Sequence, residues 1–250
     1  MTAQVRQALI LAGGQATRMR PYTDDAPKAM VPVAGAPIIG YQLRWLAEHG
    51  VESVTISGGY KAGMITEYVG SGSRFGIASV EYAIEDEPLG RGGGLKYAAG
   101  HLADAKAPFF VLNGDVITTF SLAALAEEHG RLGAAVTVAL SPYRSNWGVA
   151  DLDEKDGRIR GFVQSPELPY WINAGVYVLQ PDVVALLPDR GDHEDSTFPQ
   201  LAKEGRLFGH RLSDYWRGID TVKDVIEASR ELTKLGHVLP GEFHTTDQSA

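Results

Sequence analysis

The chain has 250 residues, 44% of them hydrophobic, and carries 23 Lys and Arg against 31 Asp and Glu. This hydrophobic fraction excludes a disordered chain, and the absence of cysteine excludes a disulfide scaffold, a thiolate metal site and a cysteine nucleophile. The net charge of −8 argues against a general nucleic-acid binder, whose affinity depends on a basic surface. Since no signal peptide or membrane-spanning run is visible, we expect a cytoplasmic protein without a membrane partner.

The first 140 residues alternate short apolar runs with amphipathic segments. Strands are predicted at 7–11, 51–57, 80–84, 109–112 and 134–140, and helices at 37–49, 61–69, 93–101 and 122–129. This alternation is typical of right-handed βαβ crossovers. It predicts the α/β fold class, with a mixed, mainly parallel central sheet flanked by helices in a Rossmann-like, three-layer α/β/α arrangement.

The pattern changes from about Gly148 onwards. A turn at 153–157 between two short strands predicts a hairpin over 148–164. Further strands at 171–179, 207–212 and 215–219 and helices at 181–187, 197–204 and 222–235 complete the predicted elements. Since no linker or repeat interrupts them, we expect a single domain over residues 1–236, with halves at 1–140 and 141–236, followed by a polar tail at 237–250.

A glycine-rich loop after the first strand gives the strongest functional signal. Residues 11–37 read LAGGQATRMRPYTDDAPKAMVPVAGAP. Gly13 and Gly14 allow backbone N–H groups to face a polyanion, whereas Arg18 offers a bidentate fork for phosphate oxygens and Lys28 a point charge. The loop is neither a Walker A motif nor a dinucleotide fingerprint. It predicts a phosphate-binding site of another kind.

This segment resembles the signature of the sugar-1-phosphate nucleotidyltransferases, L-A-G-G-x-G-T-R-(L/M)-x-P-x-T-x-x-x-P-K-x-(L/M)-x-P-(V/I)-x-x-x-P, with Ala16 in place of the third loop glycine. Later family motifs follow in order along nearly the whole chain. The resemblance implies that residues 1–140 bind a nucleoside triphosphate and residues 141–236 a sugar 1-phosphate. It implies catalytic roles for Arg18 and Lys28, and nucleotide-binding roles for Leu11, Ala12, Gly13, Gly14, Glu85 and Gly90.

The segment VEYAIEDEPLGRGGG at 80–94 corresponds to the part of the family that surrounds the nucleobase. By this match Glu85 reads the base edge, and the backbone of Gly90 approaches the base. A carboxylate only accepts hydrogen bonds, so it suits the N1–H and N2–H₂ donors of guanine better than the carbonyls of uracil. GTP is therefore the expected triphosphate. The alternative is that Glu85 belongs to a solvated acidic turn.

Two aspartates are the expected ligands of Mg²⁺, which prefers carboxylate and phosphate oxygens. Asp115 follows the strand of FVLNGDV. The second ligand in the family is the Asp of W-x-D-x-G-T, where this chain has Gly218. Asp220 lies two residues further on, which restores the same face of a strand, and we assign the second ligand to it. The alternative is that Asp220 or Thr221 caps the last helix.

The sugar side of the family pattern is altered. The Glu-Lys-Pro of the family aligns with Gln164-Ser165-Pro166, so both charges are missing. By resemblance, Gln164, Asn173 and Gly148 contact the sugar. Either Arg91, Arg144 or another cation replaces the lysine, or the acceptor differs from common hexose phosphates. Heptose, octose and cyclitol phosphates are all open.

The predicted function is Mg²⁺-dependent transfer of a nucleoside monophosphate from a triphosphate to a sugar 1-phosphate, giving a nucleotide sugar and pyrophosphate. Two other classes stay open. A nucleotide-sugar-dependent glycosyltransferase would usually carry Asp-x-Asp, whereas Asn113-Gly114-Asp115 lacks the first acid. A non-catalytic nucleotide-sugar-binding relative is the second. Dimers are frequent in the family, so a homodimer is one expected state.

Overall fold

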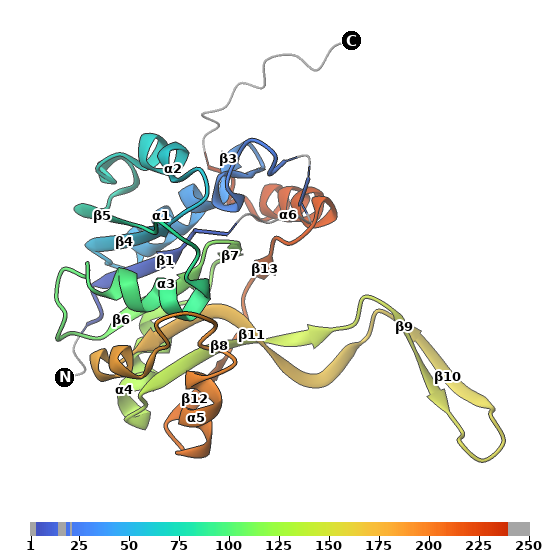
Figure 1. The fold of residues 1–250 in the computed structure, drawn as a ribbon. Coiled ribbons are helices and arrows are strands. Elements are labelled where there is room, and N and C mark those ends of the chain that lie inside the picture. Colours follow the sequence, from blue (N-terminus) through green and yellow to red (C-terminus); the bar gives the residue numbers. More distant parts are fainter. Residues whose placement is uncertain (1–3, 15–18, 21, 240–250) are drawn as a thin grey trace, which may run out of the picture.

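The computed structural model describes residues 4–14, 19–20 and 22–239, and its centre is a seven-stranded sheet (Figure 1). In spatial order the strands are β12 (Leu207–Arg211), β8 (Val136–Arg144), β11 (Glu167–Leu179), β6 (Phe109–Asn113), β1 (Gln7–Leu11), β4 (Ser53–Gly58) and β5 (Ser79–Ile84). Strand β11 is antiparallel to β8 and β6, and the other neighbouring pairs are parallel. The predicted mixed, mainly parallel sheet is confirmed, and both predicted halves of the chain contribute strands to it.

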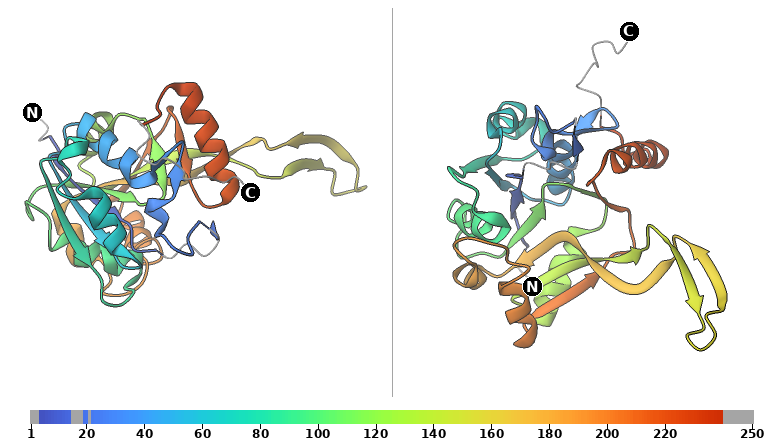
Figure 2. Two further views of the ribbon diagram at one scale, coloured as in Figure 1. Left: turned by 90° about the horizontal axis from the view of Figure 1, so that it is seen from above. Right: turned by 45° about the vertical axis from the view of Figure 1, so that its right-hand side comes forward.

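Helices cover both faces of this sheet (Figure 2). Successive residues of a strand point to opposite faces: in β1, Ile10 packs in the cluster that contains Leu43 of α1, and Leu9 packs in the cluster that contains Leu95 of α3. The first face is covered by α1 (Ile38–Glu48), α2 (Ala62–Val69) and α4 (Leu122–Leu132), and the second by α3 (Gly90–Ala99) and α5 (Thr197–Lys203). None of the helices in the described part of the chain is both long and apolar enough to cross a membrane.

Several short elements were not predicted from the sequence or differ in type. The segment at 181–187, expected as a short helix, contains the 3₁₀ helix η4 (Pro181–Leu186). Two further 3₁₀ helices are η2 (Lys28–Met30) and η3 (Ser73–Phe75). The strands β2 (Pro32–Val33) and β3 (Ala36–Pro37) form a small ladder, which shares a third apolar cluster with α6 (Val222–Leu235).

A short ladder outside the main sheet positions the C-terminal part of the site. Strand β7 (Val116–Thr118), which the sequence did not predict, pairs antiparallel with β13 (Trp216–Gly218). The buried Gln42 side chain of α1 donates to the carbonyls of Asn113 and Val116, at 2.8 and 2.9 Å. These bonds hold the turn between β6 and β7 against α1, so the chain around residue 115 is fixed from both sides.

The predicted hairpin is present as β9 (Gly148–Leu152) and β10 (Ile159–Gln164). It projects from the body as a continuation of β8 and β11, which both run beyond the main sheet (Figures 1 and 2). We call residues 145–166 the arm. The prediction placed the hairpin residues correctly, but nothing in the local pattern indicated that the ribbon would point away from the body.

Candidate active site

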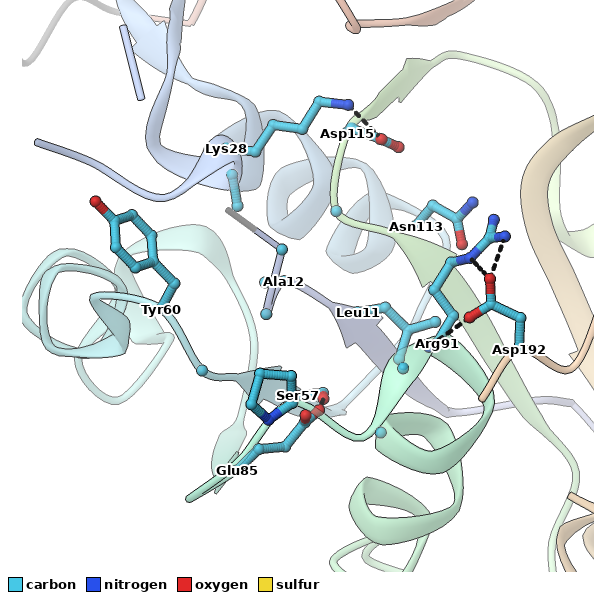
Figure 3. Close-up of a pocket in the computed structure, with 18 of the residues that line it drawn as sticks. Leu11, Ala12, Lys28, Ser57, Tyr60, Glu85, Arg91, Asn113, Asp115 and Asp192 are labelled. Carbon is cyan, nitrogen blue, oxygen red and sulfur yellow. Dashed lines mark hydrogen bonds and ion pairs between the residues drawn. The ribbon is translucent and has the colours of Figure 1, made fainter. Parts of the chain in front are cut away.

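A cavity of about 850 Å³ opens at the carboxyl ends of β1, β4 and β6 (Figure 3). This edge of a parallel sheet is the usual place for a ligand in α/β proteins. The cavity wall includes all six residues that the sequence predicted for nucleotide binding, namely Leu11, Ala12, Gly13, Gly14, Glu85 and Gly90. Lys28 and Asp115 also line it, whereas Arg18 lies outside the described residues.

Three charged side chains from distant parts of the chain meet at one end of the cavity. Lys28 comes from η2, Asp115 from the turn between β6 and β7, and Asp220 from the loop after β13. The Nζ atom of Lys28 lies 2.6 Å from Oδ2 of Asp115 and 2.7 Å from Oδ1 of Asp220. The N–H of Ile219 donates to the carbonyl of Asp115 at 2.8 Å, which ties the two aspartate loops together.

The two aspartates form a donor set that fits Mg²⁺. Both offer carboxylate oxygens to a single cationic atom, and Mg²⁺ takes one or two carboxylates while phosphate oxygens and water fill its other positions. Within the described residues no group of three or more His, Asp or Glu side chains could form a more complete metal cage. The last helix is capped by Thr221, one of the two residues that the alternative named: it is the N-cap of α6 and forms a capping box with Asp224, so Asp220 is not the cap.

Glu85 is held in the cavity wall and does not belong to a freely solvated turn. Its Oε1 accepts from the Ser57 hydroxyl at 3.1 Å, and its Oε2 accepts from the Leu89 N–H at 3.0 Å. A carboxylate has about four acceptor positions, so both oxygens keep capacity for donors of a ligand. The neighbouring Glu87 does lie in a surface ion pair, 3.0 Å from Arg190.

The glycines at the start of α3 are required by a protein loop. Gly90 has φ +80°, and a Cβ atom there would lie 2.8 Å from the carbonyl oxygen of Gly191. The N–H of Gly92 donates to the same carbonyl at 2.8 Å. The prediction explained Gly90 by its approach to a nucleobase. Although Gly90 lines the cavity, its lack of a side chain follows from the close approach of the 189–193 loop.

Arg91, in the wall of the cavity, lies between two carboxylates. Its guanidinium is 2.8 Å from Asp192 Oδ2 and 2.6 Å from Glu194 Oε2, and Figure 3 shows the bonds to Asp192. Hydrogen bonding to Arg91 holds the pKa of Asp192 below its ordinary value. Two carboxylates thus balance the charge of Arg91, which also lines the cavity, and its role as the cation for a sugar phosphate stays a prediction.

Asn173 is connected to the same network. Its Nδ2 donates to Glu194 Oε1 at 2.7 Å, and its Oδ1 accepts from the Gly175 N–H at 2.8 Å. Tyr177 also donates from its hydroxyl to Glu194, at 3.2 Å. Burial raises the pKa of that hydroxyl above its ordinary value. The amide of Asn173 thus orients Glu194 beside the cavity, and its predicted contact with a sugar stays a prediction.

Gly148 and Gln164 are not brought to the cavity. They are register partners in the ladder of the arm, and a Cβ atom on Gly148 would overlap the Phe162 ring. Packing under this ring explains the glycine without a ligand. Arg144, the other cation considered for the sugar side, lies at the base of the arm, 3.9 Å from Glu167.

The residues of the cavity wall that were not singled out from the sequence include Ser57, Asn113 and Asp192. Ser57 and Asn113 stand at the ends of β4 and β6, so their place at the carboxyl end of a parallel strand was a usable signal. Asp192 comes from a loop about 100 residues after α3 (Arg91 and Asp192 are 101 positions apart), and no local pattern marks it.

Sequence comparisons agree with this geometry. The family model described as "Nucleotidyl transferase" matches residues 7–235. A mannose-1-phosphate guanylyltransferase of Mycobacterium tuberculosis is 35% identical over 235 residues, which are 91% of this chain and 64% of that protein. The mannose-1-phosphate guanylyltransferase catalytic subunit beta of Danio rerio is 35% identical over 227 residues, 88% of this chain and 62% of that protein. The chain thus spans somewhat less than two thirds of the length of these relatives.

Solved structures with the same architecture include HddC from Yersinia pseudotuberculosis, with a TM-score of 0.73 and 25% identity over 91% of this chain and 100% of that one. The same protein complexed with GMP-PN gives a TM-score of 0.70 at 26% identity, with the same coverage of both chains. A UDP-glucose pyrophosphorylase complexed with UDP-glucose, at 20% identity and a TM-score of 0.71 over 92% of this chain and 99% of that one, shares the fold. From the residues that the family model matches and the cavity that they build, the chain belongs to the nucleotidyl transferase family.

Proposed function

We propose that this protein transfers a nucleoside monophosphate from a nucleoside triphosphate to a sugar 1-phosphate and releases pyrophosphate. The observation that carries the proposal is the convergence of Lys28, Asp115 and Asp220 at one end of the cavity. A reaction between two polyanions depends on charge neutralisation and positioning, and this cluster offers both a fixed cation and a pair of metal ligands. We also propose that the protein is cytoplasmic, as expected from its sequence.

In the proposed reaction an oxygen of the sugar phosphate attacks the α-phosphorus in line, a new P–O bond forms, and the bond to the bridging oxygen of pyrophosphate breaks. The backbone of Gly13 and Gly14, with Arg18, would hold the β- and γ-phosphates. Lys28 would contact the α-phosphate and the sugar phosphate. Mg²⁺ held by Asp115 and Asp220 would supply a Lewis acid and reduce the charge on the phosphates.

GTP is the proposed triphosphate. A carboxylate at Glu85, fixed by Ser57 and Leu89, can accept from the N1–H and N2–H₂ donors of guanine. The names of the guanylyltransferase relatives support this choice, as does the GMP-PN complex of HddC. Mannose 1-phosphate is the first acceptor to test, and heptose and cyclitol phosphates follow because the charged pair of the family is missing at Gln164-Ser165.

A matrix of five triphosphates against a panel of sugar 1-phosphates, scored by pyrophosphate release, tests the proposal. We expect release with GTP and at least one sugar 1-phosphate, and none when either substrate is left out. A glycosyltransferase would instead release a nucleoside diphosphate from a nucleotide sugar. Binding of GTP without turnover over the whole panel would favour the non-catalytic alternative.

A further inference from the structure

The loop that carries Asp220 is short, and hydrogen bonds hold its backbone on both sides of that residue. Residues 219–221 connect β13 with α6 (Figure 1). On one side, the N–H of Ile219 donates to the carbonyl of Asp115 at 2.8 Å. On the other, the N–H of Asp220 itself donates to Oδ2 of Asp224 at 3.1 Å. The first bond joins the loops of the two proposed metal ligands, and the second ties Asp220 to the first turn of α6.

Asp224 makes one hydrogen bond more than helix capping requires. In a capping box the side chain at the third helical position accepts from the N–H of the N-cap residue, which here is Thr221, at 2.8 Å. The same Oδ2 atom also accepts from the Thr221 hydroxyl at 2.8 Å and from the Asp220 N–H. Because Asp220 precedes the N-cap, this last bond lies outside the capping box. It fixes the backbone of the residue whose Oδ1 lies 2.7 Å from Lys28 Nζ.

Arg217 of β13 holds Asp224 from the opposite side. Its Nη1 atom lies 3.5 Å from Oδ1 of Asp224, the oxygen that is not used in the capping box, and 3.0 Å from Oε2 of Glu227. Its Nε and Nη2 atoms donate to the two oxygens of Glu231 at 2.9 and 2.6 Å, and a bidentate pair of this kind fixes orientation as well as distance. The two elements on either side of the Asp220 loop, β13 and α6, are therefore joined directly to each other.

We propose that Asp224, held in turn by Arg217, is a positioning residue that keeps the Asp220 carboxylate directed towards Asp115. The inference rests on the proposed function, since it takes these two aspartates as the ligands of Mg²⁺. Metal ligands are oriented by hydrogen-bonding partners behind them, and loss of such a partner typically lowers metal affinity or activity by about 10–100-fold. Asp220 depends on such a partner more than Asp115 does, because it lies on a loop and is 47% exposed, against 32% for Asp115.

Three substitutions separate positioning from helix capping. Asp224→Ala removes the bond to Asp220 together with the capping box, whereas Thr221→Ala removes the capping hydroxyl and keeps the bond between Asp220 and Asp224. Asp224→Asn keeps an acceptor oxygen and removes the charge. Both alanine variants should lower the Tm, because each loses capping bonds. Only Asp224→Ala should weaken Mn²⁺ binding to nucleotide-free protein, by about 10-fold or more, as followed by electron paramagnetic resonance. Thr221→Ala and Asp224→Asn should stay close to the wild-type affinity.

Asp220→Ala is the reference for complete loss of the ligand. If this variant binds Mn²⁺ as the wild type does, the proposed metal site fails and the positioning role falls with it. If Asp220→Ala loses the metal while Asp224→Ala binds it as well as Thr221→Ala does, the positioning role alone is overturned. Equal losses in Asp224→Asn and Asp224→Ala would also overturn it, because the effect would then come from the charge of Asp224 and not from its hydrogen bond.

A further variant covers the case in which Asp224→Ala does not fold. Asp224→Ser retains a polar residue with a helix propensity similar to that of aspartate, but its hydroxyl is one bond shorter than the carboxylate and is not expected to reach the Asp220 N–H. It should weaken Mn²⁺ binding as Asp224→Ala would. Wild-type affinity in folded Asp224→Ser would overturn the proposal.

Discussion

Removal of the Lys28 ammonium is expected to change turnover and metal affinity in opposite directions. The side chain is 13% exposed and bridges Asp115 and Asp220 at 2.6 and 2.7 Å. In the absence of substrates, this ammonium neutralises the carboxylates that are the proposed ligands of Mg²⁺. With both substrates bound, the same group would stabilise the phosphates. Lys28→Ala thus removes a competitor of the metal and a stabiliser of the reaction.

The sizes of the two effects follow from charge and exposure. Losing one fixed electrostatic stabiliser lowers turnover by about 10²–10³, which corresponds to about 2.7–4 kcal/mol. We therefore expect the turnover of Lys28→Ala to fall by at least about 100-fold. For the metal, one unit charge about 4 Å away is worth about 4 kcal/mol near a protein surface. Because Asp115 and Asp220 are 32% and 47% exposed, solvent screening reduces this effect. We expect affinity to rise by about tenfold, which corresponds to about 1.4 kcal/mol.

Turnover would be measured by pyrophosphate release, and metal affinity by Mn²⁺ titration of nucleotide-free protein followed by electron paramagnetic resonance. Lys223→Ala is the control, because this lysine of α6 is 78% exposed and 3.6 Å from Glu227. It should change neither quantity. Near-normal turnover of folded Lys28→Ala would refute its proposed role, and unchanged or weaker Mn²⁺ binding would refute the competition between ammonium and metal.

Three further outcomes are expected. Asp115→Asn should weaken Mn²⁺ binding and reduce turnover by about 100-fold or more, and a variant that keeps both would exclude it as a ligand. Glu85→Gln should reduce the preference for GTP over other triphosphates, measured as the ratio of kcat/KM values, because an amide offers one acceptor oxygen and adds donors; an unchanged ratio would contradict base reading at this position. Burial lowers the pKa of His129, so the unfolded chain binds its proton at higher pH than the folded chain. The resulting stabilisation is present above about pH 6.5 and is lost as pH falls towards the folded pKa, so thermal unfolding should show a Tm that falls below pH 6.5, and falls less in His129→Gln.

The sequence predicted the central sheet well because its signals are local. Alternating strand and helix patterns depend on residues a few positions apart, and they located the four parallel strands that build the cavity wall. The Gly13–Gly14 loop could be interpreted for the same reason, since it directly follows a buried strand. The three-residue strand β7 escaped prediction because it is too short to show a period.

Whether the position of a site residue could be predicted depended on how far it lies in the sequence from the residues that it meets. Asp115 stands at a strand end, so the fold class alone places it near Gly13. The assignment of Asp220 depended on a family pattern with a two-residue offset, and it was the β7–β13 ladder that brought its carboxylate to Lys28, 192 positions away. Such a contact depends on pairing between remote segments, which no window of sequence contains.

By itself, therefore, the sequence determined the fold class, the family and the chemical character of the phosphate loop, because these follow from local periodicity and from one contiguous motif. Only the tertiary structure decided that Arg91 is neutralised by Asp192 and Glu194, and that Gly148 and Gln164 lie on a projecting arm. The physical reason is the same for both: the charge around a side chain and the direction of a ribbon are set by neighbours that are distant in the chain and close in space.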